Sequence, residues 1–179
     1  MTGTRPTESG RTAATPVVEA GAFKAVMAEM PAAVTVITCF DGTGHPLGAT
    51  LSAVTSLSLD PPLLLACFDT GSETLAALCP GAPFLVHLLA AGQEEAAGIF
   101  AGKGRDKFER AAWSPGLEGL PELPGSAAVL ACTVDRRMPG GDHVIVTGLV
   151  GATRQPGGMP LVYHRRRLFP AQQQEEAPR

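Results

Sequence analysis

The sequence predicts a mainly β domain with a few helices. Short runs rich in β-branched and other apolar residues recur along the chain, and 21 glycines and 16 prolines punctuate them. A doubly wound sheet would need helices that alternate regularly with the strands, and this sequence lacks that alternation. The pattern therefore favours a β-barrel or a β-sandwich.

The 179 residues suffice for one domain with a tail at each end. Residues 1–18 and 170–179 show no hydrophobic periodicity, so we predict flexible tails there and a folded domain over residues 19–169. The 45% hydrophobic and 17% charged residues are ordinary for a compact globular domain.

The domain is predicted to begin with a helix over Glu19–Met30, which Pro31 ends. Its apolar residues recur at helical spacing on one face: Phe23, Val26, Met27 and Met30. A β-branched strand over Val34–Thr38 and a second strand over Leu47–Ala53 flank the turn signal Asp41–Gly44. These two strands are expected to form a hairpin.

The apolar run Leu63–Phe68 is predicted to be a strand buried on both faces. A short helix over Ser72–Cys79 follows, with Ser72 as its N-cap. The later elements are expected in this order: a strand at 84–89, a helix at 93–100, long strands at 127–135 and 143–153 joined across residues 138–142, and a short strand at 161–163.

Several function classes find no support in the sequence. A net charge of −3 does not favour binding to nucleic acid or to an acidic membrane, and no apolar segment reaches the length of a membrane span. No His pair has metal-ligand spacing, and the signatures of a phosphate-binding loop and of a serine hydrolase are missing. Four scattered cysteines form no CxxC pair, so we expect reduced structural thiols, no metal site and a cytoplasmic location: Cys39, Cys67, Cys79 and Cys132.

The segment Gly48–Leu63 combines an apolar strand and turn with five hydroxyl side chains, at positions 50, 52, 55, 56 and 58. One interpretation is an edge strand whose Ser and Thr face water. The other is a ligand-binding backbone, in which small side chains admit a flat ring while hydroxyls and amides offer hydrogen bonds. Taken alone, the segment does not decide between them.

This segment resembles the flavin reductase family of the FMN-binding split β-barrel. The family pattern is approximately G-x-T-x-S-S-x-x-S-x-S-x-x-P-P-L, and the chain matches nearly all of it, with Ala53 in place of the second serine. The resemblance continues in order over residues 20–168, through Ser72-x-Thr74, Asp106–Phe108 and Gly141–His143 to Pro160–Arg165. Ordered matches of this kind are far more specific than a single motif.

The resemblance implies an NAD(P)H:flavin oxidoreductase that reduces FMN or FAD with NADH or NADPH. It implies a homodimer, with flavin sites near its interface, and a separate flavin-dependent monooxygenase that receives the reduced flavin. Two alternatives remain at this point: a flavoprotein of the same fold that retains its flavin and acts on a dedicated substrate, and a non-catalytic flavin- or haem-binding module.

The resemblance also implies which residues bind the flavin. The segment Thr50–Ser56 would lie along the isoalloxazine, and Lys107, with Phe108 behind it and Lys103 or Arg105 assisting, would reach the phosphate. Ser72 and Thr74 would cap their helix and contact the same phosphate. The full set of expected flavin-binding residues is Thr50, Leu51, Ser52, Ala53, Thr55, Ser56, Ser72, Thr74, Lys103, Lys107 and Phe108. A solvated loop lysine is the alternative interpretation of Lys107.

His143 is the expected catalytic residue, placed by the resemblance where nicotinamide meets flavin. Hydride transfer from nicotinamide C4 to flavin N5 requires orientation more than proton transfer, so His143 would position the dinucleotide. The alternative is a histidine that begins a strand and pairs with Asp142. Tyr163 and Arg165 would flank the nicotinamide-side opening together with His164, unless they belong to a surface edge strand.

Three positions depart from the family pattern. His87 stands where the family usually has Asn, and it would either alter a contact with the flavin edge or fill space. Ala33 stands where a glycine is common. Arg166–Arg167–Leu168 replaces the Gly-x-Tyr that often ends the last strand, and the extra arginines could attract the 2′-phosphate of NADPH.

Overall fold

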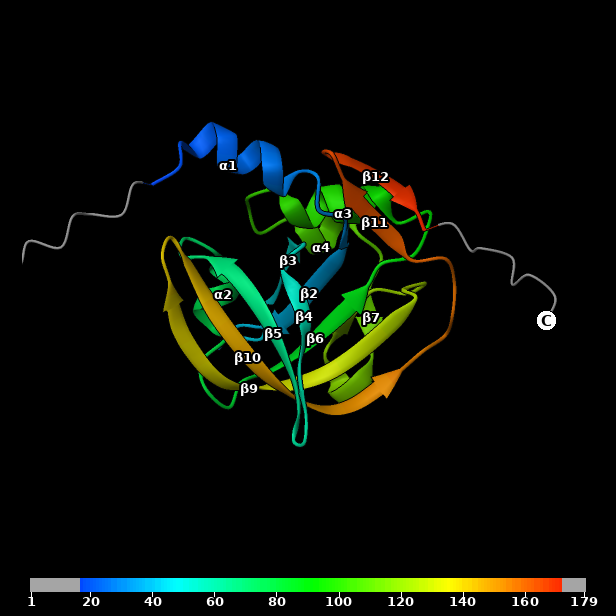
Figure 1. The fold of residues 1–179 in the computed structure, drawn as a ribbon. Helices are drawn as coiled ribbons and strands as arrows, with labels where there is room; N and C mark the ends of the chain where they lie inside the picture. The colour runs from blue at the N-terminus through cyan, green and yellow to red at the C-terminus, as the bar shows by residue number, and fades with distance from the viewer. Residues whose placement is uncertain (1–16, 172–179) are drawn as a thin grey trace, which may run out of the picture.

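A seven-stranded antiparallel sheet forms the body of the computed structural model, which describes residues 17–171 (Figure 1). Its strands are ordered β3-β2-β6-β9-β10-β5-β4. Their bounds are β2 Thr35–Phe40, β3 Pro46–Leu51, β4 Val54–Leu59, β5 Pro62–Asp69, β6 Pro83–Leu88, β9 Ala128–Gly140 and β10 His143–Arg154. Most of the two predicted tails, 1–18 and 170–179, lies outside the described residues.

The connection between β3 and β4 explains why this sheet is a barrel. The two strands occupy opposite edges of the sheet, yet only Ser52 and Ala53 separate them in the chain. Because two residues cannot cross the width of a flat seven-stranded sheet, the sheet must curl until its edges meet. The two edges are not hydrogen-bonded to each other, so the barrel remains split between β3 and β4. The predicted β fold is thus confirmed.

Smaller elements cover the ends of the barrel. A three-stranded sheet has the order β1-β11-β12, and β7 pairs with β8. Their bounds are β1 Ala32–Ala33, β7 Ser114–Pro115, β8 Pro121–Glu122, β11 Leu161–His164 and β12 Arg167–Pro170. The helices are α1 Ala20–Met27, α2 Glu73–Ala77, α3 Glu94–Ala101, α4 Lys107–Arg110 and the 3-10 turn η1 Leu117–Gly119. Figure 1 shows α1 above the barrel and beside the β11–β12 hairpin.

The barrel interior contains aromatic and aliphatic side chains from every side of the sheet. Phe68, Phe84 and Ile37 are fully buried in one cluster with residues of β9 and β10. Gly148 makes this packing possible, since a Cβ there would lie 2.5 Å from the ring of Phe84. Burying such side chains contributes about 1.5–3 kcal/mol each, which makes the barrel a rigid support for the loops around it.

The predicted hairpin and the predicted N-cap are present. Strand β2 pairs with β3 as expected, and the two long strands β9 and β10 also pair with each other, joined by residues 141–142 rather than 138–142. Ser72 accepts a hydrogen bond from the Leu75 amide at the start of α2. The prediction that Leu63–Phe68 is buried on both faces is wrong, because burial alternates along β5 as one side of the strand faces the barrel interior and the other is partly open.

Helix α1 confirms the predicted helix, although it ends at Met27 rather than at Met30. It has no buried residue, and apolar side chains are exposed on the helix (Phe23, Val26 and Met27) and just after it (Met30). The short elements α4 and β12 were absent from the sequence prediction, since each spans only four residues and carries no periodic pattern.

Candidate active site

A cleft of about 410 Å³ opens where β3, the β5–α2 turn and the α3–α4 segment meet. Among its lining residues are seven of the predicted flavin-binding residues: Thr50, Leu51, Ser72, Thr74, Lys103, Lys107 and Phe108. They come from chain segments more than twenty residues apart, so the fold brings together residues that are distant in the sequence. We call this space the basic cleft, after Lys103, Arg105 and Lys107 on its wall.

Lys107 is fixed by two backbone carbonyls. Its Nζ donates to the Gly48 carbonyl at 2.9 Å and to the Phe100 carbonyl at 3.2 Å, which ties α4 to β3 and to the end of α3. Partial burial lowers its pKa, while Glu73 and Asp106 nearby favour the charged form. An ammonium group has three donors, so one N–H remains for an anion in the cleft. Lys107 is therefore more than the solvated loop lysine of the alternative interpretation.

Lys103 and Arg105 occupy the same wall but differ in freedom. Arg105 forms an ion pair with Asp41 at 2.6 Å, and Asp41 in turn is held by the β2–β3 turn. The hydrogen bond from the Thr43 hydroxyl, those from nearby backbone amides and that from Arg105 lower the pKa of Asp41. Lys103 lies between Gly102 and Gly104 and has no side-chain partner within residues 17–171. Lys103 is thus the cation on this wall best able to meet an incoming anion.

Two hydroxyl groups of the basic cleft also form hydrogen bonds within the fold. The Thr50 hydroxyl donates to the Ala97 carbonyl at 2.7 Å, and Ser72 Oγ accepts from the Leu75 amide at 3.3 Å. The Ser72 hydroxyl therefore keeps its own O–H as a donor. Thr74 is buried beside it, and Phe108 closes the floor against Phe100 with ring centroids 5.0 Å apart.

Thr55 and Ser56 line a second space, which we call the apolar cleft, of about 430 Å³. Aliphatic side chains from β4, β5, β6, β9 and β10 make up most of its wall. Segment 50–56 therefore borders both clefts, since Thr50 and Leu51 face one and Thr55 and Ser56 face the other. Ser52 and Ala53 form the exposed link between them and line neither cleft.

His143 begins β10 at the tip of the β9–β10 hairpin. Its Nδ1 lies 2.7 Å from an Asp142 carboxylate oxygen, which is the pairing that the alternative interpretation describes. His143 also lies opposite Asp69 in the β10–β5 register, and Asp69 lines the basic cleft. His143 itself lines neither cleft, but it neighbours Asp69 of the basic cleft, a position that we call the rim, and its side chain is 45% exposed.

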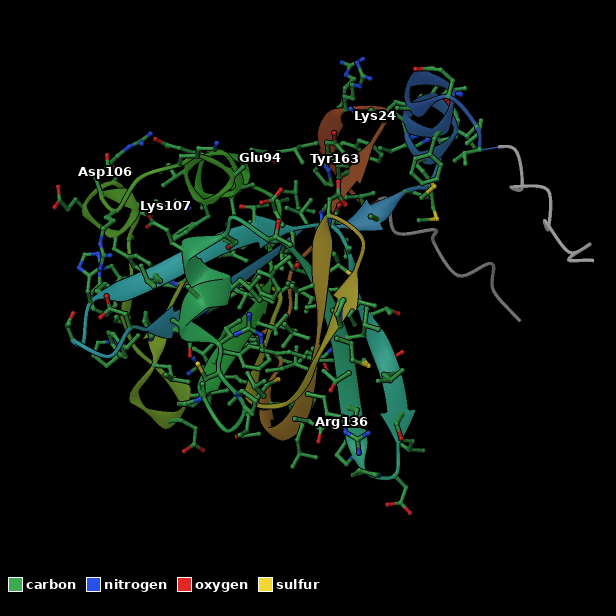
Figure 2. All side chains as sticks on the ribbon, turned by 90° about the vertical axis from the view of Figure 1, so that its left-hand side faces the viewer. Lys24, Glu94, Asp106, Lys107, Arg136 and Tyr163 are labelled. Atoms are coloured by element: carbon green, nitrogen blue, oxygen red, sulfur yellow. The ribbon has the colours of Figure 1, made fainter. Side chains whose placement is uncertain are left out.

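Tyr163 and Arg165 line neither cleft. Tyr163 pairs with Ala32 in the small sheet and is 36% exposed. Arg165 donates twice to the Glu29 carboxylate, at 2.8 Å from Nε and 2.6 Å from Nη2. Figure 2 shows Tyr163 at the top of the molecule with Lys24, whereas Lys107 lies at the side, next to Asp106.

His87 fills the barrel wall and does not face either cleft. Its side chain is fully buried, with Nδ1 3.0 Å from the Val36 carbonyl and Nε2 accepting from the Leu123 amide at 3.1 Å. These partners require a neutral ring with the proton on Nδ1. Burial is the main reason that the pKa of His87 falls to about 4. Of the two expectations for this departure, the structure supports the packing role.

Sequence reasoning missed the residues that hold the site together. The Asp41 turn, interpreted only as a turn, anchors Arg105, and the carbonyls of Gly48 and Phe100 anchor Lys107. Backbone acceptors leave no trace in side-chain identity, so no signal could have found them. Lys24 on α1 was also missed. The pKa of the Asp142 carboxyl is lowered chiefly by its hydrogen bond with His143, and the positive charge of nearby Lys24 contributes to the same shift.

Two absences apply to the described part of the chain. No group of three or more His, Cys, Asp or Glu side chains between residues 17 and 171 is arranged to hold a metal ion. Within that same range, no helix is long and apolar enough to cross a membrane.

Comparison with known proteins relates the whole described domain to flavin reductases. The profile of the flavin reductase like domain matches residues 27–172. A flavin reductase (NADH) from Kitasatospora aureofaciens is 37% identical over 84% of this chain and 81% of its own length. A flavin reductase (NADPH) from Lentzea aerocolonigenes is 38% identical, over 83% of this chain and 88% of its own.

Solved structures of flavin reductases also resemble this chain in fold. An NADH:FAD oxidoreductase from Streptomyces globisporus C-1027, in complex with NAD and FAD fragments, superposes with a TM-score of 0.79 at 31% identity, covering 92% of this chain and 100% of that one. The flavin reductase of the styrene monooxygenase from Pseudomonas putida S12 has a TM-score of 0.78 at 26% identity, covering 86% of this chain and 99% of that one.

Proposed function

The chain belongs to the flavin reductase family and is an NAD(P)H:flavin oxidoreductase, and we propose that it binds its flavin in the basic cleft. The observation that carries this proposal is the convergence of Thr50, Ser72 and Lys107 on one cleft from three separate segments. Each offers a different kind of polar group, as recognition of a flavin requires.

The basic cleft suits the phosphate end of a flavin. Lys107 keeps one free N–H, Lys103 has no side-chain partner within residues 17–171, and Ser72 retains a hydroxyl donor. Charged donors of this kind bind phosphate strongly. Arg105, held by Asp41, supplies a fixed positive charge beside them.

Segment 50–56 suits the ring end, because it borders both clefts and carries small side chains. We place the isoalloxazine along it, with Thr55 and Ser56 at the apolar cleft. Ser52 and Ala53, which line neither cleft, would then contribute their backbone.

His143 would orient the nicotinamide at the rim of the basic cleft. Bound flavin supplies a hydride acceptor and NAD(P)H supplies the hydride, so the protein has to align the two rings and exclude competing geometries. Asp142 fixes the imidazole through Nδ1, which leaves Nε2 to contact the dinucleotide. Tyr163 and Arg165 lie outside both clefts, so we assign them to the nicotinamide-side opening beyond the rim.

A homodimer fits the exposed apolar surface. Exposed apolar side chains lie on or just after α1 and on β4: Phe23, Val26, Met27, Met30, Leu57 and Leu59. Such side chains are often buried between subunits. Four free cysteines fit a reducing, cytoplasmic location.

A separate oxygenase is the proposed consumer of the reduced flavin. The related structure from Pseudomonas putida S12 is the flavin reductase of a styrene monooxygenase. By analogy, this protein would release reduced FMN or FAD to a flavin-dependent monooxygenase, and the flavin would be a substrate rather than a retained group.

Flavin binding by a Lys103→Ala variant tests the phosphate assignment. Removing one charged contact should raise the Kd for FMN about tenfold and leave the Kd for riboflavin, which has no phosphate, unchanged. Arg136→Ala is the matched control, since Arg136 lies far from the cleft at the lower end of the molecule (Figure 2). An equal loss of affinity for FMN and riboflavin would show that Lys103 does not contact the phosphate.

A further inference from the structure

The turn between β11 and β12 is built from residues that its backbone disfavours. Strand register pairs His164 with Arg167, so Arg165 and Arg166 form a two-residue turn. Both have positive φ, 48° and 62°. Asn and Gly adopt this conformation readily, whereas a long side chain there is under strain. Strain that persists in a fold is a reason to look for a function of the strained residues.

The first arginine of the turn is used to fix the turn in place. Arg165 binds the Glu29 carboxylate through two nitrogens, and its backbone amide donates to the Ala28 carbonyl at 3.0 Å. The turn is thereby attached to the end of α1. The next two arginines are therefore presented by a fixed backbone, which lowers the entropy lost when they bind a ligand.

The side chains of Arg166 and Arg167 are not engaged in holding the turn. Both are exposed, and neither forms an ion pair with any carboxylate of residues 17–171. Two exposed, unpaired guanidinium groups on consecutive residues offer N–H donors that a phosphate can accept.

Helix α1 connects this turn with the rim where His143 stands. Lys24 contributes to lowering the pKa of Asp142, so the middle of α1 lies near the β9–β10 tip. Glu29, bound to Arg165, lies five residues further on, directly after the C-cap of α1. Figure 1 shows the tip of the β9–β10 hairpin and the β11–β12 hairpin at the same end of the barrel as α1. The strand registers put His143 at the first of these hairpin ends and the arginine turn at the second.

We propose that Arg166 and Arg167 bind the 2′-phosphate of NADPH and give this reductase its preference for NADPH over NADH. The proposal rests on the reductase function and on a nicotinamide at His143. The dinucleotide would then extend from the rim past α1, with its adenosine 2′-phosphate at the arginine turn. Lys24 would add positive charge along the way.

Kinetics with both dinucleotides test the proposal. Arg166→Asn removes the charge but retains a residue that tolerates positive φ, and Arg167→Gln removes the second charge from a regular strand. Each should lower the ratio of kcat/KM for NADPH to that for NADH by about ten- to a hundredfold. Arg136→Ala, an exposed arginine at the opposite end of the molecule, should leave both values unchanged.

A binding measurement separates this proposal from the reductase function. Adenosine 2′,5′-bisphosphate should bind the wild-type protein at least tenfold more tightly than adenosine 5′-monophosphate, and the Arg166→Asn variant should lose that difference. Equal affinity of the wild-type protein for the two probes, or an equal fall of kcat/KM with both dinucleotides, would overturn the proposal. An absence of flavin-dependent turnover with a retained preference for the bisphosphate would instead contradict the reductase function.

Discussion

Replacing His87 with Asn should remove a pH dependence of stability that the wild-type fold possesses. The folded chain holds His87 neutral between the Val36 carbonyl and the Leu123 amide, with its pKa lowered to about 4. The unfolded chain has an ordinary histidine pKa near 6.5. Between these two pKa values the unfolded chain binds a proton at His87 that the folded chain does not bind, so the free energy of unfolding falls as the pH falls.

The size of the effect follows from the two pKa values. The contribution is fully present above about pH 6.5, falls progressively below it and levels off below about pH 4. Proton linkage gives a loss of about 2 kcal/mol at pH 5. The Asn variant does not titrate, and it leaves the buried Leu123 N–H without its acceptor, which costs about 1–3 kcal/mol at neutral pH. The stability advantage of the wild type over His87→Asn should therefore narrow by about 2 kcal/mol between pH 7.5 and pH 5.

Urea unfolding followed by the fluorescence of Trp113, the single tryptophan, measures this difference at each pH. His164→Asn serves as the control for loss of a half-buried histidine of β11, and it should not abolish the pH dependence that His87 causes. A wild-type advantage over His87→Asn that is the same at pH 7.5 and pH 5 would refute the assignment of a buried neutral His87.

Two further predictions concern packing and thiol reactivity. Gly48→Ala would place a Cβ 2.7 Å from the buried ring of Phe100, so it should lower the free energy of unfolding by about 1–3 kcal/mol in the same urea assay. Gly42 has open space around it, so Gly42→Ala should change the free energy of unfolding little. Burial raises the pKa of Cys39 to about 12, so iodoacetamide should modify the exposed Cys79 well before Cys39. Peptide mass spectrometry measures the two rates, and rapid modification of Cys39 in the folded protein would contradict its burial.

Local patterns predicted most of the strands and the β2–β3 hairpin, because these depend on nearby residues. The turn at Asp41–Gly44 and the apolar runs on either side of it determine the β2–β3 hairpin without help from distant parts of the chain. Closure of the barrel came only from the resemblance, since it depends on β3 and β4 occupying opposite edges of the sheet. Burial on a single face of β5 also depends on that closure, which is why the two-sided prediction failed.

The candidate site was predictable in its residue types and less so in its geometry. Thr50, Ser72 and Lys107 do meet in one cleft. The carbonyls that hold Lys107, however, are backbone groups that any residue would provide, so no sequence pattern marks them. Arg165 was expected at the nicotinamide opening, but the Glu29 carboxylate just after α1, far from it in the chain, engages its side chain.

Oxidation of NADH and of NADPH by the purified protein, each with and without added FMN or FAD, tests the central claim most directly. The account predicts rapid loss of nicotinamide absorbance only when free flavin is present, with a rate that saturates as flavin is added. Oxidation that proceeds at the same rate without added flavin, or no oxidation with either dinucleotide, would contradict a reductase that uses flavin as a diffusible substrate.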